Sequence, residues 1–197
     1  MEQNKGKKLK LEFLDFLSGA AFPLMLMIIL SASIISFAAS DDMIMNIIIV
    51  VVGEILLTAV LIIFGRQNGV VAYRKYVQQS KKREIGTSDI KALSGVGEYK
   101  IYKGFIIGLI ACVPFIIFQM INCIVPNTFC EFLLKYAFGW AYYPLSYVNA
   151  SEWLNLVWII PAPCIHALGY FIGAKREKKK QDEVAELQNG KDKKKKV

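Results

Sequence analysis

Long apolar blocks alternate with charged segments along this chain. Four blocks each hold about 20 predominantly apolar residues, the length that a helix needs to cross the hydrocarbon core of a bilayer. Only one formal charge, Glu54, lies inside any of them. Because hydrocarbon offers no water to an unpaired backbone group, segments of this length are expected to be helices. The pattern predicts an all-α, polytopic integral membrane protein with four transmembrane helices, over residues 19–38, 43–64, 105–125 and 153–172.

The basic residues indicate how these helices are oriented. Of 24 Lys and Arg residues, four precede the first block, nine lie between the second and third, and ten follow the fourth. Lys135 is the only one in the connections on the opposite side. Since cytoplasmic flanks of membrane helices are enriched in Lys and Arg, both termini are predicted to be cytoplasmic, an N-in/C-in arrangement. The chain then divides into a basic arm at 1–18, a four-helix membrane domain at 19–173 and a basic tail at 174–197.

The C-terminal tail is a low-complexity, highly charged segment. It cannot bury enough apolar surface to fold alone, and is predicted to be disordered beyond a short helical extension. Its first Lys and Arg residues directly follow the fourth block, where a basic cluster is attracted to anionic lipid headgroups at the cytoplasmic face. Membrane topology therefore accounts for the net charge of +8, and no nucleic-acid partner is expected.

Composition supports the membrane class and shows no sign of catalysis. The chain is 55% apolar with a mean hydropathy of +0.41, above the norm for soluble domains. It has one histidine, no HExxH pair and no GxSxG elbow, so no enzyme activity, metal site or cofactor is predicted. The abundance of Ile and Lys favours a bacterial plasma membrane as the location.

The first apolar block also has features of a secretory signal. A basic segment, an apolar stretch and small residues at Ser36 and Ala38 are typical of a cleaved leader. The apolar stretch is about 20 residues long, against about 7–15 in a signal peptide. Glu12 and Asp15 also interrupt the preceding arm. A retained transmembrane helix is favoured, and cleavage, which would leave three spans, stays an alternative.

The connection between the third and fourth blocks, residues 126–152, is crowded with aromatic side chains. Rings with a polar edge prefer the headgroup level of a bilayer. Lys135, Gly139 and Pro144 interrupt the segment too often for it to cross the membrane. It is predicted to be an aromatic interfacial outer loop, in part re-entrant, and an external docking surface is the less favoured interpretation. Its rings are Phe129, Phe132, Tyr136, Phe138, Trp140, Tyr142, Tyr143 and Tyr147.

Two of the four cysteines, Cys123 and Cys130, flank the outer end of the third block. If the outer face is oxidising, a disulfide between them would hold the aromatic loop in place. The sequence leaves the bonded and the free forms equally open. Cys112 and Cys164 fall within blocks and are interpreted as small packing residues.

Polar residues inside the blocks form a candidate intramembrane site. Glu54 lies near the middle of the second block, where a carboxyl is costly and usually faces a bundle interior. At about 100° per residue, the polar and small residues of the second, third and fourth blocks each gather on one face. Glu54 and His166 are predicted within about 5 Å of each other in depth, from a rise of about 1.5 Å per residue. The candidate residues are Glu54, His166, Asn46, Thr58, Gln119, Asn122 and Asn155.

Two GxxxG motifs offer surfaces for close helix packing. One, Gly104 and Gly108, lies at the start of the third block, and the other, Gly169 and Gly173, lies at the end of the fourth. Small residues four apart let helix backbones approach closely, so that dispersion and interhelical contacts replace the hydrophobic drive absent in lipid. Both motifs fall at the cytoplasmic end of the expected topology. The third and fourth helices are therefore predicted to pack against each other there.

Prolines interrupt the third and fourth blocks near their middles, at Pro114, Pro161 and Pro163. Each removes a backbone donor and clashes with the preceding turn. The two prolines in residues 161–163 are predicted to bend or locally unwind the fourth helix.

The functional hypothesis is an accessory or assembly subunit that packs through small-residue helix faces, as a homo- or hetero-oligomer in the membrane. In that case Glu54 and His166 make structural hydrogen bonds. The alternative is an oligomeric small-solute or proton-coupled transporter, which uses Glu54 and His166 at mid-membrane beside broken helices. Four spans leave little room for an alternating-access carrier in a single copy.

Overall fold

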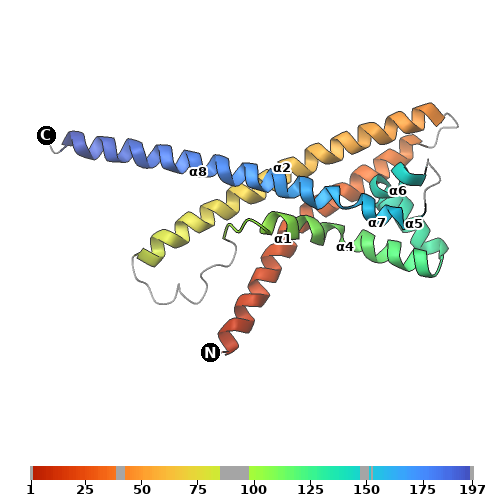
Figure 1. Ribbon diagram of the computed structural model, residues 1–197, viewed down its shortest axis with the longest axis horizontal. Helices are drawn as coiled ribbons and strands as arrows, with labels where there is room; N and C mark the ends of the chain where they lie inside the picture. Colours follow the sequence, from red (N-terminus) through yellow and green to blue (C-terminus); the bar gives the residue numbers. More distant parts are fainter. Residues whose placement is uncertain (1, 39–42, 85–97, 147–150, 152, 196–197) are drawn as a thin grey trace.

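The computed structural model describes residues 2–38, 43–84, 98–146, 151 and 153–195. Within these ranges the chain is helical and contains no strand. Four helices are long and apolar enough to cross a membrane, which confirms the all-α class and the number of candidate spans. The helices are α1 (Glu2–Ala38), α2 (Met43–Glu84), α4 (Lys103–Ile124), α5 (Thr128–Ala137), α6 (Gly139–Ser146), α7 (Leu154–Trp158) and α8 (Pro161–Lys195) (Figure 1).

Three of the helices continue well beyond their apolar blocks. α2 has 42 residues, which is about 63 Å of helix against a hydrocarbon core of about 30 Å. α1 begins at Glu2, so most of the predicted basic arm is a helical extension of the first block. Extending an existing helix avoids the unfavourable nucleation step, so a helix that forms in an apolar block can continue into the polar segment beside it.

The tail differs from the prediction of disorder for residues 174–197, since α8 runs without interruption to Lys195. The segment is rich in Lys, Glu, Gln and Ala, which are strong helix formers. Arg74 on α2 makes a bidentate ion pair with Glu177, with N–O distances of 2.8 and 3.2 Å. Lys179 and Glu183 add a weak pair four residues apart. Helix propensity and these pairs account for the continuation.

The long helices cross one another instead of running side by side along their whole length (Figure 1). α2 and α8 cross near their middles and make the most extensive helix pair in the structure. α5, α6 and α7 gather at one end of the bundle, whereas the two chain termini lie away from that end. The described helices thus divide into a crossing region and an end built from short helices.

The core lies between α1, α2 and α4 and includes Met27, Leu61, Ile107 and Phe115. Much of the remaining apolar surface is exposed, including an aliphatic face on α2. Contiguous exposed apolar surface of this extent is unusual for a soluble monomer, and it is the expected outer face of helices that lipid surrounds. The exposed residues of that α2 face are Ile44, Met45, Ile47, Ile48, Val51, Val52, Ile55 and Leu56.

The short helices α5 and α6, here called the aromatic wedge, insert their junction into the bundle. Phe138 and Trp140 at this junction are buried. Their ring centroids lie 5.9 and 6.1 Å from that of Phe115, which is in the middle of the third apolar block. The Trp140 backbone N–H donates to Ser31 Oγ on α1 at 3.5 Å. The wedge therefore reaches the level of Phe115 and Ser31, deeper than a surface loop.

The fourth apolar block is broken into α7 and α8 at Ile159 and Ile160, directly before Pro161. The Ile160 backbone N–H donates to Val157 O at 3.2 Å, a tighter turn than the α-helical pattern. Proline is favoured in the first turn of a helix, where its missing N–H has no intrahelical partner. The break agrees with the predicted unwinding of residues 161–163 and lies just before them.

Candidate functional site

The crossing of α2 and α8 depends on four glycines, Gly65 and Gly69 on α2 and Gly169 and Gly173 on α8. We call this set the glycine crossing. A Cβ atom added at any of them would overlap the backbone of the facing helix, and at Gly169 it would lie 2.5 Å from Ile62 O. Only residues without side chains allow such an approach. The two backbones are therefore in direct contact.

The glycine crossing corrects the predicted use of the GxxxG motifs. α4 does pack against α8, as expected. However, Gly104 meets the side chain of Tyr170, and a Cβ at Gly108 would lie 2.8 Å from Pro163 Cα. Gly169 and Gly173 face α2 instead of α4. Their partner is a third motif, the segment 65–69 with sequence GRQNG. Its spacing was visible in the sequence, but its polar residues placed it in the connection after the second block.

His166 lies beside the glycine crossing and is fully buried. Its Nδ1 is 2.7 Å from Gly104 O on α4, and its Nε2 is 3.4 Å from Asn68 Nδ2 on α2. A carbonyl oxygen only accepts, so Nδ1 carries the hydrogen and Nε2 accepts from the Asn68 amide. Asn68 Nδ2 also donates to Gly19 O on α1 at 3.2 Å. One imidazole and one amide thus connect all four long helices at the same level.

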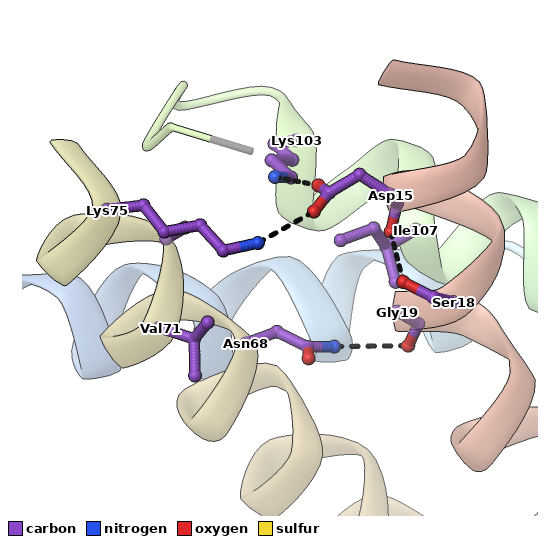
Figure 2. Close-up of a pocket in the computed structure, with 9 residues that line it drawn as sticks. Asp15, Ser18, Gly19, Asn68, Val71, Lys75, Lys103 and Ile107 are labelled. Atoms are coloured by element: carbon purple, nitrogen blue, oxygen red, sulfur yellow. Dashed lines mark hydrogen bonds and ion pairs between the residues drawn. The ribbon is translucent and has the colours of Figure 1, made fainter. Parts of the chain in front are cut away.

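A charged cavity lies next to this connection, between α1, α2 and α4 (Figure 2). Asp15 is placed between two lysines there. Lys75 Nζ donates to Asp15 Oδ1 at 3.0 Å, and Lys103 Nζ donates to Asp15 Oδ2. The cavity has a volume of about 140 Å³. Its lining residues are Asp15, Ser18, Gly19, Asn68, Val71, Ala72, Lys75, Lys103 and Ile107.

Burial differs strongly between the two lysines of this cluster. The Lys103 side chain is 6% exposed, and its ammonium lies 5.7 Å from the centre of the Phe16 ring. The Lys75 side chain is 44% exposed. A buried ammonium requires a partner, because leaving it unpaired would cost several kcal/mol. Asp15 supplies that partner for Lys103, while Lys75 remains accessible to solvent or headgroups.

The segment before α4 is held to α1 by a further ion pair. Lys100 Nζ donates to Glu12 Oε1 at 2.8 Å. This hydrogen bond raises the pKa of Lys100 above its ordinary value, so the ammonium form is favoured. Together with Asp15, the pair fixes the amino-terminal half of α1 against the start of α4.

Glu54 is far from this region, which corrects the prediction of a shared pocket with His166. His166 lies opposite Gly65. Gly65 follows Glu54 by 11 residues, or about 16 Å of helix. The Glu54 carboxyl instead lies beside the side chain of Trp158 on α7, and its Oε1 is buried without a hydrogen-bond partner among the described residues. The estimate from sequence assumed that the second and fourth apolar blocks span the same depth. In the structure, backbone contact at the glycine crossing sets the register of α2 against α8.

The remaining candidate residues are divided between the helices. Gln119 and Asn122 on α4 are buried, as is Asn155 on α7. Asn122 Oδ1 accepts from the Asn127 backbone N–H at 3.4 Å, beyond the end of α4. Asn155 Oδ1 is buried and accepts no hydrogen bond from the described part of the chain. Asn46 and Thr58 are half-buried residues of α2.

Cys123 and Cys130 are free thiols in this structure, without the disulfide that the sequence left open. Gln119 Nε2 donates to Cys123 Sγ at 3.5 Å. Cys130 is buried on α5. The aromatic wedge is held by packing instead of a covalent link.

The described residues contain no group of three His, Cys, Asp or Glu side chains that could hold a metal ion. The chain matches no family model, no curated protein and no solved structure.

Two groups of functional candidates escaped the sequence analysis. Asp15 and Lys103 were counted only as charges that flank the apolar blocks, and Asn68 was assigned to a connector. The spacing of the charges could have indicated this cluster. Glu12 and Asp15 lie three residues apart, which puts them on one face of a helix. Lys100 and Lys103 have the same spacing in the sequence. The sequence predicts that the second helix continues past its apolar block, but it lacked the evidence that α1 is helical at Glu12 and Asp15 and that it meets α2 and α4 there.

Proposed function

We propose that the protein is a non-enzymatic accessory or assembly subunit of a larger membrane complex. The observation that carries this proposal is that both ring nitrogens of His166 are occupied, by Gly104 O and by Asn68. A backbone carbonyl and a side-chain amide do not titrate, so these two hydrogen bonds fix the imidazole in place and provide no group with which it could exchange a proton. The glycine crossing adds support, since helix backbones in direct contact suit a rigid framework better than a moving carrier.

The proposed topology places both termini, the charged cavity and the extension of α8 on the cytoplasmic side of a bacterial plasma membrane. The support is the distribution of Lys and Arg, with 23 of 24 on that side of the apolar blocks. In this topology the aromatic wedge enters from the outer face as a re-entrant segment. Buried backbone of this kind is tolerated at membrane depth because protein surrounds it.

Partner capture tests the assembly role. The full chain, tagged at its N-terminus, is purified from gently solubilised membranes after cross-linking in intact cells. A second copy or another membrane protein in fixed stoichiometry is the expected result. Recovery of a cross-link-free monomer at native expression level would contradict the proposal.

A transporter is the second candidate, favoured by one specific feature. The break between α7 and α8 lies next to Trp158, which contacts Glu54. Broken helices beside an intramembrane carboxyl are found at substrate sites of secondary transporters. Glu54→Gln keeps the shape of the side chain and removes its charge. Loss of proton flux in reconstituted vesicles on Glu54→Gln, with flux retained in Glu131→Gln, would establish the carrier. Equal behaviour of both variants would exclude it.

A further inference from the structure

A second cavity lies between α2, α8 and the segment that precedes α4. Its volume is about 310 Å³, roughly twice that of the charged cavity. The lining combines aromatic rings with basic side chains, an unusual pairing for a helix–helix crevice. The residues are Tyr73, Tyr99, Phe171, Ala174, Lys175 and Lys178.

The aromatic wall of this cavity is a stack of tyrosines. Tyr99 stacks on Tyr170 with ring centroids 5.5 Å apart and an interplanar angle of 10°. Tyr73 contacts Tyr99 edge-on at 6.1 Å. The neighbouring Lys100 is tied to Glu12 on α1, which fixes the segment that carries Tyr99. The wall is therefore preorganised, with little further ordering needed when a ligand binds.

The opposite wall is a single stripe of α8 that changes character along the helix. Phe171, Ala174, Lys175 and Lys178 follow the i, i+3, i+4, i+7 pattern of one helical face. Phe171 is 45% exposed at the end of the fourth apolar block. The two lysines come one and two turns later, toward the tail. The stripe thus passes from apolar to basic in the direction that leads out of the membrane.

Lys175 and Lys178 form no ion pair with any described residue. This distinguishes them from Lys75, Lys100 and Lys103, whose ammonium groups are paired with Asp15 or Glu12. Two unpaired ammonium groups about one turn apart offer six N–H donors and two positive charges. They suit an anion with several acceptor oxygens, such as a phosphodiester.

We propose that this cavity binds one anionic phospholipid. Its phosphate lies between Lys175 and Lys178, and its glycerol and first methylene groups lie against Phe171 and the tyrosine wall. Basic pockets between transmembrane helices on the cytoplasmic side recognise such headgroups. The apolar lining excludes a bare phosphate ion as a full occupant. The proposal rests on the cytoplasmic placement given above for this end of the bundle, but does not depend on an assembly partner.

Lipid retention by the purified full chain tests the site. The protein in detergent is titrated with phosphatidylglycerol or phosphatidylcholine at high ionic strength, where diffuse attraction between exposed charges is screened. Bound lipid is counted by native mass spectrometry. The test variant is Lys175→Ala with Lys178→Ala. The matched control is Arg176→Ala with Lys179→Ala, which removes the same charge at the same spacing from the neighbouring face of α8.

One tightly held phosphatidylglycerol per chain is expected, with phosphatidylcholine held more weakly. The test variant should bind phosphatidylglycerol about 25-fold more weakly, or about fivefold per lysine, while the control stays near the parent. Equal loss in the two variants would show diffuse attraction and overturn the site. Displacement of the lipid by inorganic phosphate or glycerophosphoglycerol alone would indicate a small-anion site. Displacement by an acidic peptide would indicate a protein-docking surface. Because the assay uses the isolated chain, it can fail while the assembly role stands.

Discussion

The glycine crossing and the aromatic wedge are two regions of the same bundle that are held together by different means. At the crossing, the helix backbones touch, and hydrogen bonds hold the side chains of His166, Asn68 and Asp15. At the wedge, large rings fill the space around Trp140, whose Nε1 is buried without a hydrogen-bond partner among the described residues. Buried polar atoms without partners are costly and usually mark water, a ligand or a missing contact. The crossing is thus held by backbone contact and hydrogen bonds, whereas the wedge is held by the packing of aromatic rings.

The largest expected effect on stability comes from adding a side chain at the glycine crossing. Gly173→Val places a branched side chain against the backbone of Arg66, which cannot retreat without separating α2 from α8. A loss of about 3 kcal/mol is expected, at the upper end of the usual cost of overpacking. Thermal unfolding in mild detergent, followed by circular dichroism, measures it. Gly6→Val is the control, because nothing lies within 4 Å of a Cβ at that position. Similar losses in the two variants would contradict the backbone contact.

The hydrogen bonds around His166 should come next. His166→Ala removes the side-chain donor to Gly104 O and leaves one hydrogen of the Asn68 amide without its acceptor. The expected loss is about 2 kcal/mol, within the range for an unsatisfied buried polar group. Asn68→Ala in the same background should cost less than it does in the parent, because the two side chains share one network. Strict additivity of the two substitutions would refute the network.

The two lysines of the charged cavity should differ in their importance. Lys103→Met removes the buried partner of Asp15 and should destabilise the fold by about 1–2 kcal/mol, since Lys75 still pairs with the carboxylate. Lys75→Met removes a half-exposed partner and should cost about 0–1 kcal/mol, decreasing further with added salt. Chemical unfolding at low and high ionic strength separates the two. A reversed order would mean that Lys103 is not the buried member of the cluster.

Because Glu54 lies far from His166, we expect substitutions at the two residues to affect the free energy of unfolding independently. Glu54→Gln combined with His166→Ala should give the sum of the single effects on the free energy of unfolding, within about 0.5 kcal/mol, because distant sites without shared partners add. The four proteins of this double-mutant cycle are compared in one detergent. A coupling energy above about 1 kcal/mol would restore the shared pocket that the sequence suggested.

The smallest effect concerns pH. Hydrogen bonding to Glu12 raises the pKa of Lys100 above the ordinary lysine value of 10.5. A group with a raised folded-state pKa contributes stability that is fully present below its unfolded pKa and is lost as the pH rises through its folded pKa. The difference in melting temperature between the parent and Lys100→Met should therefore be constant near neutral pH and disappear as the pH rises past 10.5 and through the folded-state pKa of Lys100. A difference that persists unchanged at high pH would contradict a contribution from the ion pair between Lys100 and Glu12.

Sequence reasoning recovered the features that depend on local composition. Four apolar blocks of sufficient length made the helical class and the number of candidate spans predictable, because hydrocarbon permits few alternatives. The prolines at 161 and 163 likewise marked the break in the fourth block. In each case the physical cause lies within a few residues of its effect.

The candidate site could not be placed in the same way. The depth of His166 depends on which glycines of α2 meet α8, a pairing between segments about 100 residues apart. The sequence offered three GxxxG motifs and no rule for choosing partners among them. Glu54 and His166 were therefore expected within about 5 Å in depth, whereas about 16 Å of helix separates Glu54 from the level of His166. Asp15 and Lys103 were missed because their value as a pair appears only once α1 and α4 converge.

The contact between the backbones of α2 and α8 also makes a pivot. Beyond Gly173, α8 continues for about 33 Å as an unbroken rod, so a tilt of about 10° at the crossing would carry its far end through about 6 Å. The bidentate pair between Arg74 and Glu177 restrains α8 only four residues beyond Gly173. A restraint so close to the crossing opposes tilting of the long remainder of α8 only weakly. A small difference in the crossing angle is thereby magnified at the charged end of α8.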